Sequence, residues 1–549
     1  MLARQLAYIT YVRGSMSTLQ ILLFLYFYGF MPPTLSREEP YFCCPCKPTK
    51  LNGGRTWNLP EHDPDKWALF KKYNERDVKV EMLIRERLQW FPMPESVWEE
   101  YRIDQEINDR GIMIDRELAE QALRIDARSR EELLFSLKAK TGLSNPNSVA
   151  QMKGFLEKQG INVSSLGKKG IAEIIKNAAP ETAEMLSSYQ KLSKTSVRKY
   201  QSMLNAVCED GRCHGMFQFY GANRTGRWAS KIVQLQNLPQ NHMEDLERAR
   251  ALVKAGEYEI IKQQYSSIPD MLSELIRTAF IPRFGNKFIV ADFSSIEARV
   301  LSYLANEKWR MEVFHQGRDI YCESASRMFG VPVEKNGQNA HLRAKGKLAE
   351  LGLGFGASVS ALKNMGALEM GLKEKELKPL VDAWREANPH IVAYWWAVDG
   401  AVKKAIKQKK TYKVGCVLFQ VKCGMLFITL PSGRKLEYAT PRIEKNQYGG
   451  ESVTYMGIDA TKKWSRLESY GPKFVENIVQ GISRDILAYA MRTLHGQNIC
   501  GHIHDELIIE CEHDVSLEEI CEQMGRTPPW LPGIELRADG YECTFYQKQ

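Results

Sequence analysis

The sequence has no apolar run long enough for a comfortable membrane span. Its longest such run, Leu19–Met31, has 13 residues and follows Arg4 and Arg13. This is the outline of a signal peptide, but no A-x-A-like cleavage site comes after Met31. We therefore expect a buried helix or strand here, or an upstream stretch outside the folded domain, and no membrane among the partners.

Two other signatures are also missing. There is no G-x-x-x-x-G-K-[ST] segment, which argues against a P-loop nucleotide site. The 12 cysteines follow no repeating pattern, so they indicate reduced thiols of an intracellular, cytoplasmic protein. Cys43-Cys44-Pro45-Cys46 contains a C-x-x-C spacing, but no second pair of ligands follows at zinc-ribbon distance.

Size and charge set broad limits. A chain of 549 residues is too long for one core and predicts two to four domains or subdomains. Lys and Arg number 75 against 66 Asp and Glu, a net charge of +9. This excess favours an anionic partner such as nucleic acid, but charge alone fits a mildly basic enzyme without a polyanion equally well.

Hydrophobic periodicity predicts helical blocks around a small, late sheet. A long helix over 67–90 ends at Pro92 and Pro94. Further segments are predicted as mainly helical at 97–204, 242–280, 294–410 and 472–495, and as strands or hairpins at 287–292, 411–454 and around His504. This order favours an α+β fold over a doubly wound sheet.

The most informative segment is Lys287–Tyr303. An apolar strand, Phe288–Ala291, stops on the acid Asp292, and Glu297 follows at the start of an amphipathic helix. A carboxylate at a sheet edge can hold a divalent metal against a phosphate. Ser294-Ser-Ile-Glu297 also has the spacing of a capping box, which on local pattern alone explains Glu297 without catalysis.

A second acidic site is predicted at Asp505, in the polar centre His504-Asp505-Glu506 of a hairpin. Two carboxylates that meet across a sheet could bind two metals for in-line phosphoryl transfer. An ordinary polar turn and a zinc site that uses His502 and His504 remain as alternatives, although the zinc site lacks a third ligand nearby.

A basic stripe is predicted between these acids. Arg343, Lys347, Leu351 and Phe355 are four residues apart and form one face of a helix. Two cations followed by an apolar and an aromatic residue suit a triphosphate, a sugar and a base. A solvated basic face is the alternative.

Together these segments resemble the motifs of the family A (DNA polymerase I-like) DNA polymerases, most closely the phage type. Motifs A, B and C are matched in order by Asp292–Glu297, Arg343–Gly356 and His504–Glu506. Two more family segments are matched by Thr225–Arg227 with Gln234–Pro239, and by Gln480 at the position of a DNA-contacting glutamine. The resemblance covers about residues 97–549.

The resemblance implies a right-hand polymerase that extends a primer on a template with dNTPs, acts as a monomer and serves phage or bacterial replication. It implies two Mg²⁺ ions, replaceable by Mn²⁺, held by Asp292, Asp505 and the backbone carbonyl of Phe293. Lys347 would protonate the leaving group. The residues implied to bind the nucleotide are Arg343, Lys347, Glu297 (as a steric gate), Leu351, Phe355 and Tyr321. Those implied to contact DNA are Arg227, Gln236, Asn237, Gln480 and His504.

Domain boundaries follow from the same resemblance. They are an N-terminal segment with a partial ribonuclease H-like 3′–5′ exonuclease at 1–92, palm entry and thumb at 93–205, palm at 206–305, fingers at 306–440 and palm again at 441–549. Tyr73-Asn-Glu-Arg-Asp77 resembles the third exonuclease motif, but no convincing D-x-E precedes it. The resemblance therefore implies a truncated exonuclease domain and no proofreading.

The chain also departs from the family pattern. Leu351 stands where the family often has Phe or Tyr, Phe355 and Phe293 stand at positions usually held by Tyr, and Tyr321 takes the place of a phosphate-contacting His. A Phe at 355 lacks the hydroxyl that usually bonds the gate glutamate. Three alternatives remain: an inactive DNA-binding remnant, a single-subunit RNA polymerase, from which Glu297 and the full His504–Glu506 differ, and a nuclease.

Overall fold

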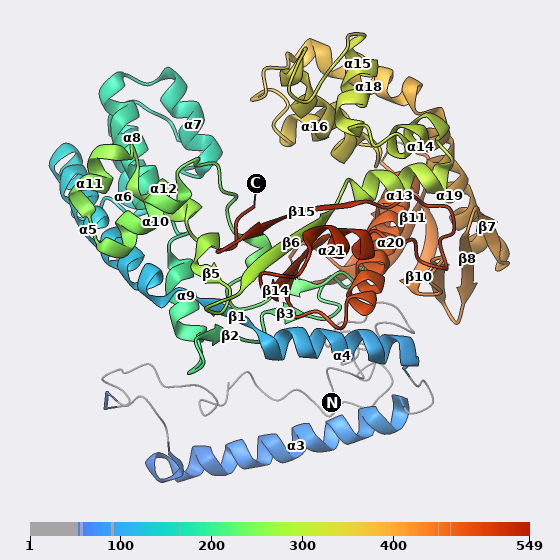
Figure 1. Ribbon diagram of the computed structural model, residues 1–549, viewed down its shortest axis with the longest axis horizontal. Helices are drawn as coiled ribbons and strands as arrows, with labels where there is room; N and C mark the ends of the chain where they lie inside the picture. Colours follow the sequence, from blue (N-terminus) through green and yellow to red (C-terminus); the bar gives the residue numbers. More distant parts are fainter. Residues whose placement is uncertain are drawn as a thin grey trace. The chain divides into compact units, whose positions relative to one another are not determined.

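The computed structural model describes residues 53–54, 59–88, 93–163, 165–447, 449–461 and 463–548. The chain divides into two compact units (Figure 1): unit 1 has residues 1–99, 223–226 and 300–482, and unit 2 has 100–222, 227–299 and 483–549. Leu19–Met31 and Cys43–Cys46 lie outside the described residues. Within the described ranges, no helix is long and apolar enough to cross a membrane.

Unit 2 combines a helical region with three small sheets. Its helices are α5 (Arg116–Thr141), α6 (Val149–Lys158), α7 (Lys168–Asn177), α8 (Pro180–Leu192), α9 (Arg198–Ala206), α10 (Leu246–Ala255), α11 (Tyr258–Gln264), α12 (Ile268–Glu274) and α21 (Leu517–Met524), with short 3₁₀ turns η3 (Leu235–Asn237) and η4 (Arg277–Ala279). Three helices run from one unit into the other: α4 (Glu95–Arg110), α13 (Ile296–Ala305) and α20 (Gly471–Thr493).

The sheets of unit 2 are antiparallel. Their strand orders are β2-β1-β5 (Arg212–Cys213, Ile112–Ile114, Phe280–Ile281), β3-β4 (Phe217–Gln218, Ala229–Ser230) and β13-β14-β6-β15 (Ile499–Ile503, Glu506–Cys511, Lys287–Phe293, Ala538–Cys543). In the last sheet β6 has a neighbour on each side, and its residues Phe288–Ala291 are buried. A continuous apolar run is the sequence pattern of such an interior strand.

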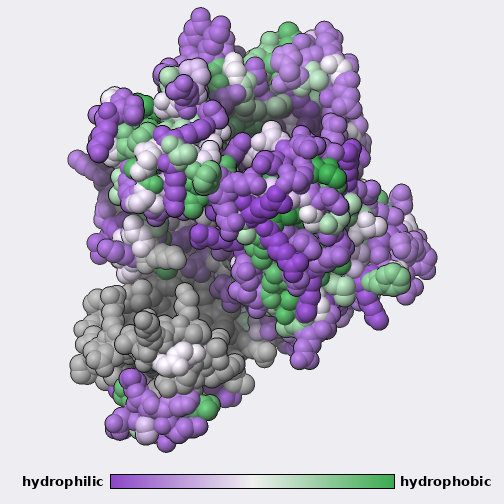
Figure 2. All heavy atoms as spheres, turned by 90° about the vertical axis from the view of Figure 1, so that its left-hand side faces the viewer, coloured by the Kyte–Doolittle hydropathy of each residue, from purple (hydrophilic) through white to green (hydrophobic). Residues whose placement is uncertain are grey.

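The helices α5–α8 enclose a core of their own. Buried side chains from these helices and their connections meet there: Leu137, Met152, Leu156, Val163, Ile171, Met185, Leu186, Tyr189 and Leu192. Burying one such side chain contributes about 1.5–3 kcal/mol, so the cluster explains how a mostly helical region folds around its own apolar faces. Hydrophilic residues predominate on the face of the molecule in Figure 2.

Unit 1 has helices followed by a six-stranded sheet. The helices are α3 (Pro64–Leu88), α14 (Lys308–His315), α15 (Ile320–Phe329), α16 (Arg343–Leu353), α17 (Val359–Asn364), α18 (Glu374–Ala387) and α19 (Pro389–Gln408), with 3₁₀ turns η2 (Pro60–His62) and η5 (Ala340–Leu342). The sheet order is β12-β11-β10-β9-β8-β7, from Trp464–Ser469, Glu451–Ile458, Lys435–Lys445, Met425–Thr429, Val417–Lys422 and Tyr412–Val414. Helix α19 packs against β7–β10 (Figure 1).

The structure confirms the α+β prediction and most predicted elements, with two refinements. The sheet of residues 412–469 is continuous, so the predicted fingers–palm boundary at 440 falls inside β10. Before residue 99, the described residues form only η2, α3 and the start of α4. Tyr73 and Asp77 lie on α3, and no strand of a ribonuclease H-like sheet occurs in that described part.

Candidate active site

Strand pairing brings Asp292 and Asp505 together at one edge of the β13-β14-β6-β15 sheet. Asp292 is opposite Glu506 in the β6–β14 register, so the preceding Asp505 lies beside the end of β6. The Phe293 backbone N–H donates to the Asp505 carbonyl at 3.2 Å. The two acids, 213 positions apart in the sequence, are therefore placed by backbone geometry and not by flexible side chains.

The turn that carries Asp505 is tight and strained. Only His504 and Asp505 separate β13 from β14, and His504 has a φ of 56°. A positive φ at the first position of a two-residue hairpin turn is normally left to glycine. A non-glycine residue in this region costs about 1 kcal/mol or more and is often found at functional sites.

Burial and the neighbouring acid act together on Asp292. Burial and, next, the charge of Asp505 raise the pKa of Asp292 to about 8. Its Oδ1 atom is buried and has no hydrogen-bond partner in the structure. Such an oxygen needs a proton or a cation, and carboxylate oxygens suit hard divalent ions.

The residues present therefore fit a divalent cation. Among the described residues, no group of three or more His, Cys, Asp or Glu side chains is arranged to hold a metal. Backbone oxygens, water or a substrate phosphate would have to complete the coordination by Asp292 and Asp505. His502 does not join His504 in a zinc site, because its ring is buried against Phe217 and Trp228, at 4.3 and 5.0 Å between ring centroids.

Glu297 has a partner that the sequence did not reveal. Glu297 accepts a hydrogen bond from Arg227 and forms an ion pair with it, and both side chains are about three-quarters buried. The capping-box prediction is wrong in register, because α13 begins at Ile296 and the residue before it is Ser295, whose carbonyl accepts from the Arg299 N–H. A gate candidate and a DNA-contact candidate are thus paired with each other.

The other predicted DNA contacts are divided between the units. In unit 2, Gln236 and Asn237 lie in η3, where the Gln236 N–H donates to the Ser230 hydroxyl at 3.1 Å. Desolvation lowers the pKa of His504, and the charge of Arg227 adds to this against the opposing effect of Asp505. In unit 1, Gln480 is half-buried on α20.

Three predicted nucleotide ligands meet on α15 and α16 of unit 1. The Arg343 guanidinium is 5.3 Å and the Lys347 ammonium 5.9 Å from the centroid of the Tyr321 ring. Leu351 is 52% exposed on the same face of α16. Phe355 is not on the helix as predicted, because α16 ends at Leu353. Gly346 allows the close approach, since a Cβ there would lie 2.1 Å from the Tyr321 carbonyl oxygen.

The opposite face of α16 carries a buried network that the sequence analysis missed. Glu350 accepts hydrogen bonds from both terminal nitrogens of Arg310, from the Ser324 hydroxyl and from Trp384 Nε1. Arg310 also donates to Asn388 Oδ1 at 3.1 Å. The sequence signal was an acid, Glu350, on the apolar side of a helix. Such a residue needs a partner, but its local sequence does not identify which residue that is.

Asp319 was also missed, although its signal was readable. Its Oδ1 atom caps α15 by accepting from the Tyr321 and Cys322 N–H groups, at 2.8 and 3.2 Å. Its Oδ2 atom accepts from Arg343 Nε at 2.8 Å. An Asp immediately before a helix predicts an N-cap. This local signal could have singled out Asp319, whose second carboxylate oxygen then reaches Arg343 of the basic stripe.

Paired acids on a sheet edge and a basic helical stripe are the features of a nucleotidyl-transferring enzyme. A family model described as "DNA polymerase family A" matches residues 102–418. A DNA polymerase of Bacillus phage SP02 is 48% identical over 514 residues, which cover 92% of this chain and 79% of the phage protein. The chain therefore belongs to DNA polymerase family A.

More distant relatives agree. The thermostable DNA polymerase I of Thermus thermophilus is 24% identical over 370 residues, 66% of this chain but only 35% of that enzyme. A solved structure titled "POL domain of Pol1 from M. smegmatis complex with DNA primer-template and dNTP" matches with a TM-score of 0.58 and 20% identity, over 85% of this chain and 72% of that one. At this identity the likeness shows the fold, that of a family A polymerase domain.

Proposed function

We propose that the protein extends a DNA primer on a template with dNTPs, and that Asp292 and Asp505 form its catalytic centre. The observation that carries this proposal is the Asp292 oxygen without a hydrogen bond, which lies beside Asp505 where the pairing of β6 and β14 fixes both residues. The solved relative bound to primer-template and dNTP supports these substrates. The phage relative supports a role in replication within an infected bacterial cell.

The cofactor proposed is a pair of Mg²⁺ ions, for which Mn²⁺ can substitute. Asp292, Asp505 and the Phe293 carbonyl would hold them. When bound, the ions activate the primer 3′ hydroxyl and stabilise the charge on the attacked α-phosphate and the leaving pyrophosphate.

The basic stripe would bind the triphosphate. Arg343 supplies a guanidinium held by Asp319, and Lys347, which is exposed, supplies an ammonium that can protonate the leaving pyrophosphate. Tyr321 lies against both cations and would limit their range of positions. Leu351 and Phe355 provide the apolar surface for the base.

Glu297 would guard the sugar. With Phe at 355 and no hydroxyl there, Arg227 is the group that fixes the Glu297 carboxylate in this structure. A fixed carboxylate can reject a 2′-hydroxyl by steric and electrostatic conflict. Gln236, Asn237, Gln480 and His504, together with Arg227, would contact the primer–template, and the chain would act as a monomer.

The test is primer extension with dNTPs and, separately, with rNTPs. The wild type should extend with dNTPs, Asp292→Asn should not, and Asp382→Asn, an exposed acid on α18, should behave as wild type. No extension by the wild type would leave the inactive DNA-binding remnant as the better interpretation. Efficient extension with rNTPs alone would favour an RNA polymerase.

We propose that the described part of this chain does not proofread, because Tyr73 and Asp77, which resemble the third exonuclease motif, lie on α3 without a second acidic motif beside them. A primer with a mismatched 3′ end should not be shortened by the wild type. Metal-dependent shortening that Asp77→Ala abolishes would overturn this.

A further inference from the structure

Lys548 brings a positive charge to the acidic edge of unit 2. Three carboxyl groups gather there, those of Asp292, Asp505 and Glu506. In the part of the chain that the structure describes, Lys548 is the one cation in an ion pair with any of them, with its Nζ 3.2 Å from Glu506 Oε2. The Lys548 side chain is 21% exposed, so this is a sheltered contact.

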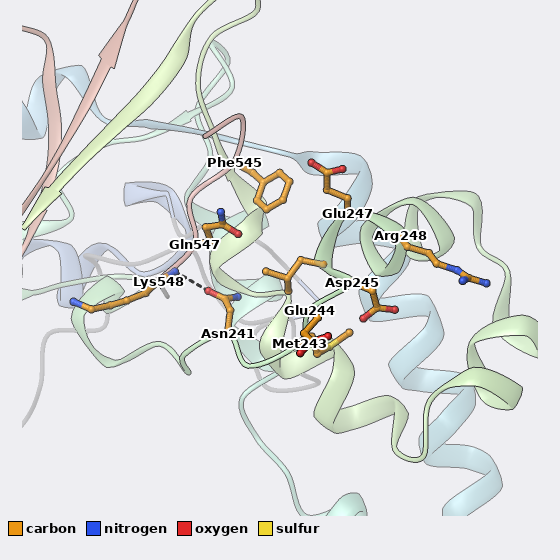
Figure 3. Close-up of a pocket in the computed structure, with 10 residues that line it drawn as sticks. Asn241, Met243, Glu244, Asp245, Glu247, Arg248, Phe545, Gln547 and Lys548 are labelled. Atoms are coloured by element: carbon orange, nitrogen blue, oxygen red, sulfur yellow. Dashed lines mark hydrogen bonds between the residues drawn. The ribbon is translucent and has the colours of Figure 1, made fainter. Parts of the chain in front are cut away.

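The backbone around Lys548 is well anchored. Its N–H donates to Asn241 Oδ1 at 2.9 Å, and Asn241 in turn donates to the Glu274 carbonyl at 2.6 Å. The Tyr546 N–H donates to the Phe280 carbonyl at 2.8 Å. Figure 3 shows Asn241, Phe545 and Gln547 lining a pocket, with the Lys548 side chain extending away from them. The backbone that carries Lys548 is therefore held in place, and the ion pair with Glu506 directs its ammonium.

Glu506 is satisfied at both oxygens. Tyr546, which is fully buried, donates its hydroxyl to Glu506 Oε1 at 2.7 Å and accepts from Arg277 Nη1 at 2.9 Å. Lys548 takes the other oxygen. Asp292, directly opposite Glu506 in the sheet, keeps an oxygen with no partner. Of the three carboxylates, Glu506 has a partner at each oxygen, whereas Asp292 has one buried oxygen without a hydrogen bond.

We propose that Lys548 is a positioning residue for the metal centre: its ammonium neutralises Glu506 and holds that carboxylate away from the divalent cation, so that Asp292 and Asp505 are the carboxylates that bind the metal. The proposal rests on the proposed function, in that it requires a divalent cation at these two aspartates. Without Lys548, Arg277, which bonds the Tyr546 hydroxyl, and a bound cation remain to compensate the charge of Glu506, and the repulsion between ammonium and cation is also lost.

The test compares Mn²⁺ binding to the free protein, followed by electron paramagnetic resonance at pH 9, with thermal melting in the absence of metal. Lys548→Met should bind Mn²⁺ about tenfold more tightly, since a nearby unit charge is worth at least this much. It should also melt at a lower temperature without metal, and added Mn²⁺ should restore much of the loss. Lys548→Arg should stay close to wild type in both.

A double-mutant cycle with Glu506→Gln shows whether Lys548 acts through Glu506. In the Glu506→Gln background, Lys548→Met should change Mn²⁺ binding and melting less than it does alone, and the effect that remains is the direct action of the ammonium on the cation, Asp292 and Asp505. Lys287→Met is the matched control, because Lys287 is also a buried lysine paired with a glutamate, Glu542 at 2.6 Å, but it lies at the far end of β6. It should lower the melting temperature and leave Mn²⁺ binding unchanged.

An unchanged Mn²⁺ dissociation constant in Lys548→Met, or an effect equally large with Gln at 506, would overturn the proposal. Asp292→Asn separates this failure from failure of the proposed function. If Asp292→Asn binds Mn²⁺ as the wild type does, the metal site itself is wrong. If it does not bind while Lys548→Met remains unchanged, only the role of Lys548 falls.

Discussion

In unit 2, Asp292 and Asp505 are short side chains set by a strand end and a two-residue turn. In unit 1, Arg343 and Lys347 are long side chains on the outer face of a helix. Asp292 is buried beside Asp505, and burial followed by the charge of Asp505 disfavours the charged form of Asp292 and raises its pKa. Lys347 is exposed and Arg343 is half-buried, so these two charges stay in contact with solvent and their side chains cost the folded state little.

The two regions differ in whether the same residues affect both activity and stability. At the acidic edge, the two carboxylates that we propose for catalysis should also oppose folding when no metal is bound. On α16, the exposed face is the one that we propose for the substrate, while the buried Glu350–Arg310 pair on the other face holds the helix. Substitutions in the two regions should consequently have opposite signatures in activity and melting temperature.

The largest effect is expected for Asp505→Asn. Loss of metal coordination should lower kcat by about a thousandfold or more, because a bound cation supplies several kcal/mol of charge stabilisation. The metal-free protein should nevertheless melt at the same or a higher temperature, since one of two mutually repelling acids is gone. Primer extension and differential scanning calorimetry measure both quantities. A clear drop in melting temperature would mean that Asp505 is a structural acid.

Glu350→Ala should produce the reverse. It leaves the Arg310 guanidinium, which is fully buried, without its counter-ion, and breaking such a pair costs about 3–5 kcal/mol. We expect a large fall in the free energy of unfolding by urea denaturation, and a raised KM for dNTP in the protein that remains folded. Lys378→Ala, which breaks an exposed ion pair on neighbouring α18, is the control and should change stability little.

Lys347→Met should lower activity with little effect on stability. If its ammonium protonates pyrophosphate, general acid catalysis worth about a hundredfold is lost. The side chain is exposed and forms no ion pair with the described residues, so the melting temperature should not change. Single-turnover extension at saturating dNTP distinguishes proton donation from binding, because loss of the donor lowers kcat whereas loss of a binding charge raises KM. A Lys347→Met enzyme with a raised KM and normal kcat would assign the residue to binding alone.

These contrasts also show what the sequence could predict. Strand β6 with Asp292 near its end, the hairpin at Asp505 and the part of the stripe from Arg343 to Leu351 were all local patterns, and these are found in the fold, whereas Phe355 lies beyond the end of α16. The Arg227–Glu297 pair and the contact between Lys548 and Glu506 join distant parts of the chain, and nothing in their local sequence names a partner. Glu297 shows where a local pattern misleads. Its spacing from Ser294 predicted a helix cap, but in the structure its carboxylate binds Arg227, 70 positions upstream.

The last expected effect is a dependence on pH, of at most about tenfold for each pH unit. The pKa of Asp292 in the folded protein, about 8, is above its unfolded value, so the folded state favours the proton and metal-free stability should decline as pH rises from about 4 towards 8. A bound cation must displace that proton, and Mn²⁺ affinity should therefore increase by up to about tenfold per pH unit below pH 8 and level off above it. Isothermal titration calorimetry in buffers of different ionisation enthalpy reports the released proton directly. Asp505→Asn should flatten the decline of metal-free stability with pH, because the neighbouring charge that adds to burial in raising the pKa of Asp292 is gone. A decline that persists unchanged in that variant would show that burial alone controls Asp292, and the two acids would then not form one titrating unit.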